Sequence, residues 1–147
     1  MKRPDLHLPT QLSASEKTLI KKIVQDYLEV MFRVGSRFTF RPPHSVILGS
    51  YEPHYVLLFL HELGHFLTQH YNFTTDIERL KIEREAWENA KKLCVKYSIP
   101  YDEEFAEAQL DSYRDWLHSK SKCKKCGLTR YQTKNGQYHC PHCDLTA

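Results

Sequence analysis

The sequence predicts an α+β fold that is mostly helical, with a small domain over residues 1–118 and a four-cysteine module over residues 119–147. Three observations support this prediction. Four stretches carry apolar residues at the spacing of a helix face. Two short stretches between the first and the second of these have the composition of strands. Two C-x-x-C pairs lie near the end of the chain, where the charge is strongly basic.

The first helix and the two strands are expected in the N-terminal third of the chain. Ser13 and Glu16 form an S-x-x-E capping box, which predicts that the helix begins after Ser13. Apolar residues at helical spacing follow it and extend the predicted helix to about Gly35. Residues 37–41 alternate between polar and apolar, and residues 45–48 are mainly apolar, so both are predicted to be strands.

Three more helices are expected after the strands. The second covers residues 53–71 and is apolar on nearly all sides at residues 56–60, which predicts the buried central element of the domain. The third covers residues 75–97 and opens with a capping box that ends at Glu78. Asp102 is expected to open the fourth helix.

The charge of the chain is uneven, although the formal net charge is only +3. Residues 119–147 hold six Lys or Arg residues and one acid, whereas the preceding residues hold 15 basic and 17 acidic residues. The longest apolar run, Tyr55 to Leu60, is far shorter than the roughly 20 residues that a membrane helix needs. No apolar stretch follows Lys2 and Arg3, so a secretory signal is not expected. We therefore expect a cytoplasmic protein with no membrane partner.

His61, Glu62 and His65 form the pattern H-E-x-x-H in the second predicted helix. Positions i and i+4 lie on one helix face, so the two imidazoles can bind one zinc ion at ~2.0–2.1 Å. Zinc lowers the pKa of a bound water to about 7, and Glu62 lies where it can take the proton as general base. The alternative is a helix with two unrelated histidines. A polar segment inside a buried helix is costly, however, unless its groups have partners.

A catalytic zinc ion usually has three protein ligands and one position for water. The third predicted helix offers several glutamates, among which Glu85 is the preferred ligand and Glu83 the second choice. Small residues, Ala86 and Ala90, would let this helix approach the histidine helix closely. Asn89 is a candidate for orienting a histidine ligand, or for ordinary helix packing. The alternative for the glutamates is a solvated acidic face.

A third histidine ligand is not expected. The pattern H-E-x-x-H-x-x-G-x-x-H would need Gly and His where this sequence has Thr68 and Tyr71. His70 lies five residues after His65, about 140° round a helix from it, and is expected to point away.

The segment His61-Glu-Leu-Gly-His65, followed by Glu83-Arg-Glu-Ala-Trp-Glu-Asn-Ala90, resembles the ImmA/IrrE-type metallopeptidases. That family carries H-E-L-G-H and a downstream E-A-x-x-x-A helix whose glutamate is the third ligand. Over roughly residues 55–95, the resemblance implies a zincin domain with His61, His65 and Glu85 on zinc and Glu62 as base. It also implies cleavage of regulatory proteins such as repressors, in phage or mobile-element settings. Trp87 departs from the family pattern, which has a small polar residue there.

The C-terminal module contains two C-x-x-C pairs with 13 residues between them, formed by Cys123, Cys126, Cys140 and Cys143. This spacing is typical of a zinc ribbon with four thiolate ligands. A hairpin is expected across Asn135-Gly136, and a Lys/Ser linker over residues 118–122. His139 and His142 are possible competing ligands. The combination with an H-E-x-x-H domain is similar to SprT-like proteases, although their third ligand is usually a histidine.

We therefore expect a zinc metalloendopeptidase with two zinc ions, one catalytic and one structural, that acts on a protein substrate. The basic ribbon is expected either to contact nucleic acid or protein, or to be a structural appendage. Two alternatives are a non-enzymatic adaptor whose first zinc is structural, and a zinc hydrolase with a non-peptide substrate.

Several supporting roles are open in the sequence. Four side chains are candidates for stabilising the developing oxyanion, namely Tyr51, Tyr55, Tyr113 and His118. Residues 45–48 are the candidate for pairing with an extended substrate. Cys94 is expected to be a core thiol rather than a nucleophile.

Overall fold

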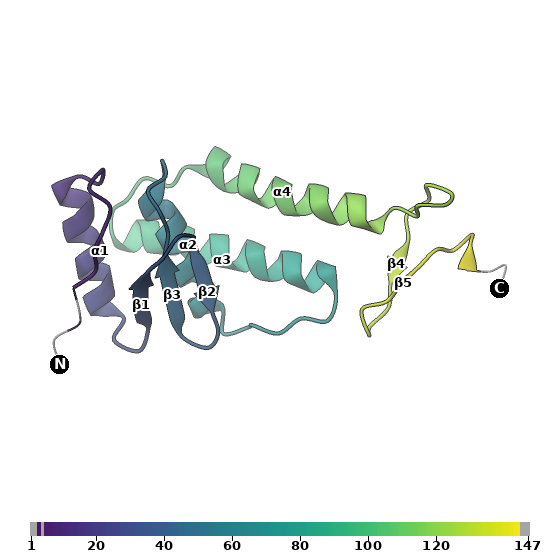
Figure 1. The fold of residues 1–147 in the computed structure, drawn as a ribbon, viewed down its shortest axis with the longest axis horizontal. Helices are drawn as coiled ribbons and strands as arrows, with labels where there is room; N and C mark the ends of the chain where they lie inside the picture. Colours follow the sequence, from purple (N-terminus) through teal and green to yellow (C-terminus); the bar gives the residue numbers. More distant parts are fainter. Residues whose placement is uncertain (1–2, 4, 145–147) are drawn as a thin grey trace. The chain divides into compact units, whose positions relative to one another are not determined.

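The computed structural model describes residue 3 and residues 5–144, and it confirms the α+β class (Figure 1). Contacts group the chain into two units, residues 1–71 with 85–101 and residues 72–84 with 102–147. No helix in the described part of the chain is both long and apolar enough to cross a membrane. The elements follow in the order α1 Ala14–Asp26, β1 Met31–Val34, β2 Thr39–Arg41, β3 Ser45–Leu48, α2 Tyr55–Thr68, α3 Asp76–Lys96, α4 Glu103–Ser121, β4 Tyr131–Gln132 and β5 Tyr138–His139.

The first unit contains a three-stranded sheet in the order β1-β3-β2. Strand β3 is parallel to β1 and antiparallel to β2, so Phe32 and Phe40 both lie opposite Val46. On this face the rings of Phe32 and Phe59 of α2 meet edge to face, with centroids 5.8 Å apart. Val46, Leu48 and Phe59 are completely buried. The core of the unit therefore lies between the sheet and α2, which fixes the histidine helix on the sheet.

Helix α1 begins as predicted but ends earlier. The backbone N–H of Ser13 donates to Glu16 Oε1 at 3.0 Å, and that of Glu16 donates to Ser13 Oγ at 3.1 Å. The helix ends at Asp26 rather than near Gly35, and Met31, which the predicted helix included, opens strand β1 and is 54% exposed. Strand β1 forms by pairing with β3, and local periodicity carries no information about such a non-local contact.

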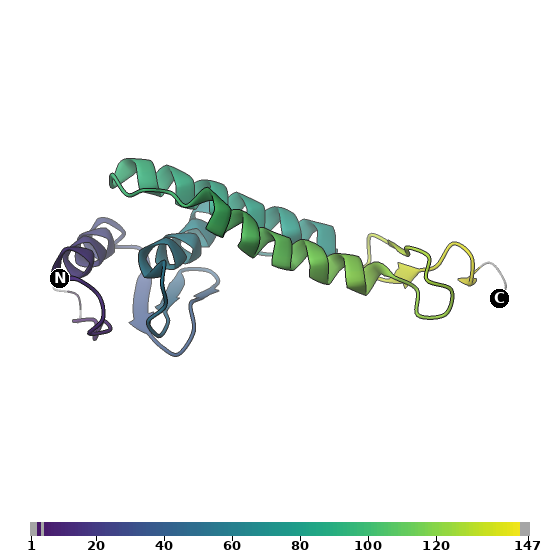
Figure 2. The same ribbon diagram turned by 90° about the horizontal axis from the view of Figure 1, so that it is seen from above.

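The second unit contains the first turns of α3, helix α4 and the cysteine module. Both ribbon views show α4 alongside the first half of α3 (Figures 1 and 2). Asp102 caps α4 as predicted, because its carboxylate accepts from the Phe105 N–H at 3.0 Å. The predicted linker over residues 118–122 is wrong, since α4 continues to Ser121. The expected domain boundary after residue 118 therefore lies inside a helix, and the division of the chain into these two domains stays a prediction.

Candidate metal centres

Helix α2 presents His61 and His65 on one face, as their spacing predicts, and their ring centroids are 4.6 Å apart. His61 is only 8% exposed, whereas Glu62 and His65 are partly exposed. The pair is therefore anchored in the core at one end and open to solvent at the other. His70 is exposed beyond the C-terminal end of α2, as expected for a residue outside the site.

Glu83 of α3, and not Glu85, joins the two histidines. Ligand atoms of His61, His65 and Glu83 all lie within 4.8 Å of one another, so these three side chains could hold a metal ion. Glu83 is 8% exposed, whereas Glu85 is exposed to solvent and lies outside the group. This corrects the preference for Glu85. Residues two apart are about 200° apart round a helix, so only one of the two carboxylates can face α2.

The two helices that carry this group pack backbone against backbone. A Cβ atom on Gly64 would lie 2.2 Å from the carbonyl oxygen of Ala86. Ala86 and Ala90 are completely buried, which confirms that small residues allow the close approach. The Asn89 side-chain amide donates to the Gly64 carbonyl at 3.1 Å. Of the two roles considered for Asn89, this contact corresponds to helix packing. This contact fixes the rotation of α3 about its own axis, and with it the direction of Glu83.

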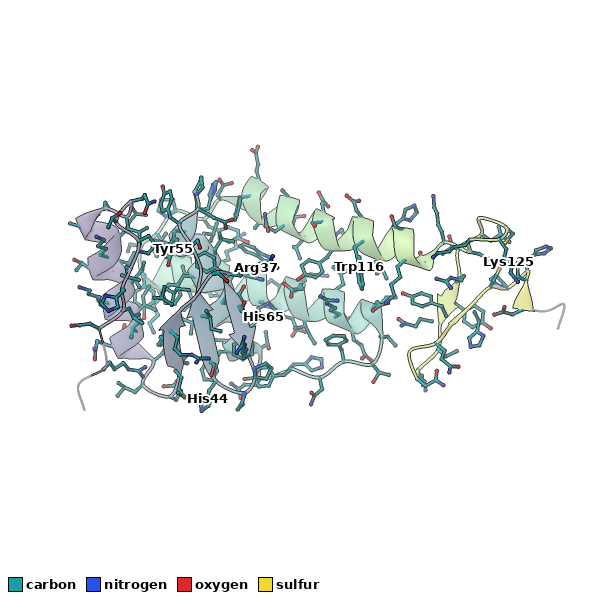
Figure 3. All side chains as sticks on the ribbon, viewed as in Figure 1. Arg37, His44, Tyr55, His65, Trp116 and Lys125 are labelled. Atoms are coloured by element: carbon teal, nitrogen blue, oxygen red, sulfur yellow. The ribbon has the colours of Figure 1, made fainter. Side chains whose placement is uncertain are left out.

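Aromatic rings flank both histidines, a feature that the sequence did not predict. The Trp87 ring stacks on His61 with a centroid distance of 4.2 Å and an interplanar angle of 21°. The Phe40 ring of β2 lies parallel to the ring of His65 (labelled in Figure 3), and the ring centroids are 6.0 Å apart. Trp87 is 3% exposed, so its large ring is part of the core and limits the orientations open to His61. The family comparison marked Trp87 only as a departure, although its place beside Ala86 indicated that it faces α2.

Tyr113 of α4 lies next to Glu83, close enough for the carboxylate to act on its pKa. Burial and the neighbouring Glu83 carboxylate raise the pKa of Tyr113 to about 12. The phenol therefore stays protonated at neutral pH and can donate to the carboxylate. The Arg79 guanidinium lies 5.5 Å from the Tyr113 ring centroid. Glu83 is thus held from one side by a neighbouring helix.

The other candidate oxyanion donors differ in position. The Tyr55 hydroxyl donates to the Gly49 carbonyl at 3.0 Å, and burial raises its pKa to about 12, so it has a structural role. Tyr51 is 42% exposed, and its ring stacks on Tyr55 at 6.4 Å. His118 is exposed and lies five residues beyond Tyr113. Of the four candidates, Tyr113 is the one with a contact to the ligand group.

The expectation that residues 45–48 bind an extended substrate is wrong, because β3 is the central strand and is paired on both sides. Strand β2 lies at the edge of the sheet and pairs only with β3. It also carries Phe40, whose ring lies against His65. The free edge nearest the histidines therefore belongs to β2.

The four cysteines of the C-terminal module form a second group, with all four sulfur atoms within 4.8 Å of one another. The sulfur atoms of Cys126 and Cys140 are 3.5 Å apart, and those of Cys123 and Cys143 are 3.8 Å apart. Two thiolates on one tetrahedral zinc ion, with Zn–S bonds of ~2.3 Å, would be separated by roughly 3.8 Å. The sulfur positions therefore fit a four-thiolate site, as the spacing predicted.

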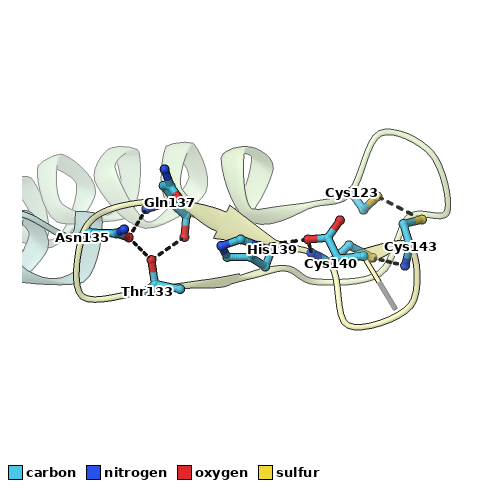
Figure 4. Close-up of polar contacts among 8 residues, drawn as sticks. Cys123, Thr133, Asn135, Gln137, His139, Cys140 and Cys143 are labelled. Carbon is cyan, nitrogen blue, oxygen red and sulfur yellow. Dashed lines mark hydrogen bonds and ion pairs between the residues drawn. The ribbon is translucent and has the colours of Figure 1, made fainter. Parts of the chain in front are cut away.

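Local geometry supports this cysteine group. The backbone turns at Gly127 and Gly136 with φ of 78° and 88°, and β4 pairs antiparallel with β5 across the second turn. His139 lies outside the sulfur group, and its ring contacts Asp144 at 3.2 Å (Figure 4). Backbone N–H groups of Cys126 and Lys125 lower the pKa of Cys123 to about 6, which favours the thiolate that binds metals.

Cys94 differs from the four clustered cysteines. It is 1% exposed, and burial raises the pKa of its thiol to about 11. A thiol of this kind is a poor nucleophile at neutral pH. The expectation of a core thiol agrees with this environment.

No protein-family model, curated protein or solved structure matches this chain.

Proposed function

We propose that this protein is a zinc-dependent metallopeptidase, with a zinc ion on His61, His65 and Glu83. The observation that carries the proposal is the meeting of two imidazoles and one buried carboxylate, contributed by neighbouring helices. Two histidines and one glutamate are the ligand set of a well-known class of zinc hydrolases. A zinc ion held there would polarise a peptide carbonyl and lower the pKa of a water molecule. The four cysteines would hold a second, structural zinc ion.

Glu62 is the residue that we assign to proton transfer. It follows His61 directly, lies outside the ligand group, and is partly exposed where Glu83 is buried. A solvated carboxylate beside the reacting atoms can take a proton from water and give it to the departing amine. The two glutamates thus have different roles, since Glu83 would bind the zinc ion and Glu62 would transfer the proton. The resemblance to ImmA/IrrE-type peptidases assigns Glu62 the same role.

We further propose that the substrate is an extended protein segment that lies along the edge of β2. An edge strand offers unpaired backbone groups, with which an extended peptide can form a ladder of hydrogen bonds. Strand β2 has such an edge and lies against His65 through Phe40. Tyr113 is the candidate for steadying the developing oxyanion, because its protonated phenol lies close to Glu83 and its one proton could turn from that carboxylate to the oxyanion.

Metal removal tests the proposed activity. Incubation with a chelator should abolish cleavage of labelled casein, and added zinc should restore it, because the His61, His65 and Glu83 side chains alone do not acidify water. The measurement is the release of labelled peptides over time. A control with His7→Ala, an exposed histidine outside the group, should behave like the wild type.

Absence of zinc-dependent cleavage across casein and a peptide library would contradict the peptidase proposal. Cleavage that survives complete metal removal would contradict it as well. A zinc-loaded protein that binds a partner without turnover would instead fit the adaptor alternative.

A further inference from the structure

The cysteine module meets helix α3 at Asp76, the first residue of that helix. The Asp76 carboxylate accepts a hydrogen bond from the Tyr138 hydroxyl at 2.6 Å, and Lys120 Nζ lies 2.9 Å from it. The Asp76 backbone N–H donates to Gln132 Oε1 at 2.7 Å. Asp76 is only 7% exposed, and a buried carboxylate is tolerated where it has such partners. Tyr138 and Lys120 hold its pKa below the ordinary value, despite the opposing effect of burial.

The turn of the hairpin adds a second contact. A Cβ atom on Gly136 would lie 2.9 Å from the carbonyl oxygen of Thr74, so the turn packs against the backbone just before α3. The first backbone N–H groups of a helix have no partner within the helix. Gln132 of the hairpin supplies one for α3. The Tyr138 hydroxyl and the Gln132 side-chain oxygen of the module are therefore both engaged by the first residue of α3.

A line of contacts leads from this junction to Glu83. Asp76, Arg79 and Glu83 lie at positions i, i+3 and i+7, on one face of α3. The Arg79 guanidinium stacks on the ring of Tyr113, which lies next to Glu83. The Arg79 guanidinium also lies 5.1 Å from the Trp116 ring centroid. The module thus holds the first turn of α3, and α4 holds the second and third.

We propose that the cysteine module is a brace that orients Glu83, with Asp76 as the positioning residue. The proposal rests on the ligand role of Glu83 in the proposed function. The first turn of a helix frays unless its backbone groups find partners, and here the Thr75–Glu78 capping box and the hairpin both supply them. A fixed α3 keeps the Glu83 carboxylate at the histidines before the metal arrives. If the start of α3 is not held, the Glu83 carboxylate can point in other directions.

Cobalt binding tests the brace without any need for turnover. The full chain is prepared with zinc on the cysteines, and the histidine group is titrated with Co²⁺ while its visible absorption is followed. Asp76→Ala should weaken cobalt binding at the histidines by about tenfold, the usual scale for residues that orient a metal ligand. Amides of residues 77–84 should also exchange hydrogen at least about tenfold faster, because the helix start is released. Lys134→Ala, an exposed lysine of the same hairpin, should change neither quantity.

Two further variants separate a brace from general loss of structure. Tyr138→Phe keeps the ring and removes one hydrogen bond to Asp76, so it should give a smaller loss of cobalt affinity in the same direction. Cys126→Ser should release the metal of the module and reproduce the effect of Asp76→Ala at the histidines. In the double variant the two losses should not add, because both act through one contact.

Unchanged cobalt affinity and unchanged exchange in Asp76→Ala would overturn the brace. So would full cobalt affinity in Cys126→Ser. These results are distinguishable from failure of the peptidase proposal. If Asp76→Ala weakens cobalt binding but the wild type cleaves no peptide, the brace proposal stands and the peptidase proposal fails. If the histidines of the wild type bind no cobalt, the proposed metal centre is wrong. The hydrogen-exchange rates of Asp76→Ala then still test whether the module holds the start of α3.

Discussion

Replacement of Glu62 by Gln should leave the metal content unchanged and lower peptide hydrolysis by about 10²–10⁴-fold. Glutamine has nearly the same shape as glutamate but cannot accept a proton at neutral pH. Glu62 lies outside the ligand group, so its loss should not release metal from His61, His65 and Glu83. The comparison needs the turnover number with labelled peptide and the zinc content of the same sample.

Glu85→Gln is the matched control, because Glu85 is an exposed glutamate of α3 outside the ligand group. Its turnover should stay at the wild-type level. Undiminished hydrolysis in Glu62→Gln would remove this residue from proton transfer. A loss of zinc in Glu62→Gln would show that the carboxylate binds metal instead.

Trp87→Ala should destabilise the protein by about 3–5 kcal/mol, the usual cost of deleting a large buried aromatic ring. Trp87 is 3% exposed, and it stacks on His61 at 4.2 Å. The cavity left by alanine would lie directly against the His61 ring, so His61 would gain freedom of rotation. In a chain of this size the melting temperature should fall on the order of 10 °C. Metal affinity at the histidines should fall as well.

Trp116→Ala is the control for the loss of stability. Trp116 is 38% exposed, so its replacement should lower the melting temperature much less than that of Trp87. Trp87→Phe should recover part of the stability, because it restores an aromatic ring against His61. Equal melting temperatures for the wild type and Trp87→Ala would contradict the packing described for α2 and α3.

The parts of the site that follow from local spacing could be predicted from the sequence. His61 and His65 share a face because any helix places i and i+4 together. The cysteine pairs and the turn at Asn135-Gly136 are local in the same sense. Such features need no knowledge of how distant segments pack.

The third member of the histidine group depends on helix packing, and there the structure brings Glu83 rather than the preferred Glu85 to the histidines. Which glutamate faces α2 is fixed by the contact between Gly64 and Ala86. The sequence nevertheless carried a usable signal, since Glu83, Ala86, Trp87 and Ala90 recur at the spacing of one helix face. All four are buried. If the helix face that carries Ala86 and Ala90 is taken as the face against α2, Glu83 is the glutamate predicted to lie at the histidines. The family pattern predicted Glu85 instead.

Strand β1 and the junction at Asp76 could not be predicted from local patterns. Strand β1 exists because residues 31–34 pair with residues 45–48. Asp76 accepts a hydrogen bond from Tyr138, which lies 62 positions away in the sequence. A carboxylate at the start of a helix is ordinarily a solvated group that complements the helix dipole. Nothing local marks this one as buried.

Metal counting by native mass spectrometry tests the central claim, that Glu83 completes a metal site with His61 and His65. The wild type should carry two zinc ions, and Glu83→Ala should fall to nearly one, because the four cysteines keep theirs. Glu85→Ala should retain both. Two zinc ions in Glu83→Ala, or the loss of one in Glu85→Ala, would contradict the account.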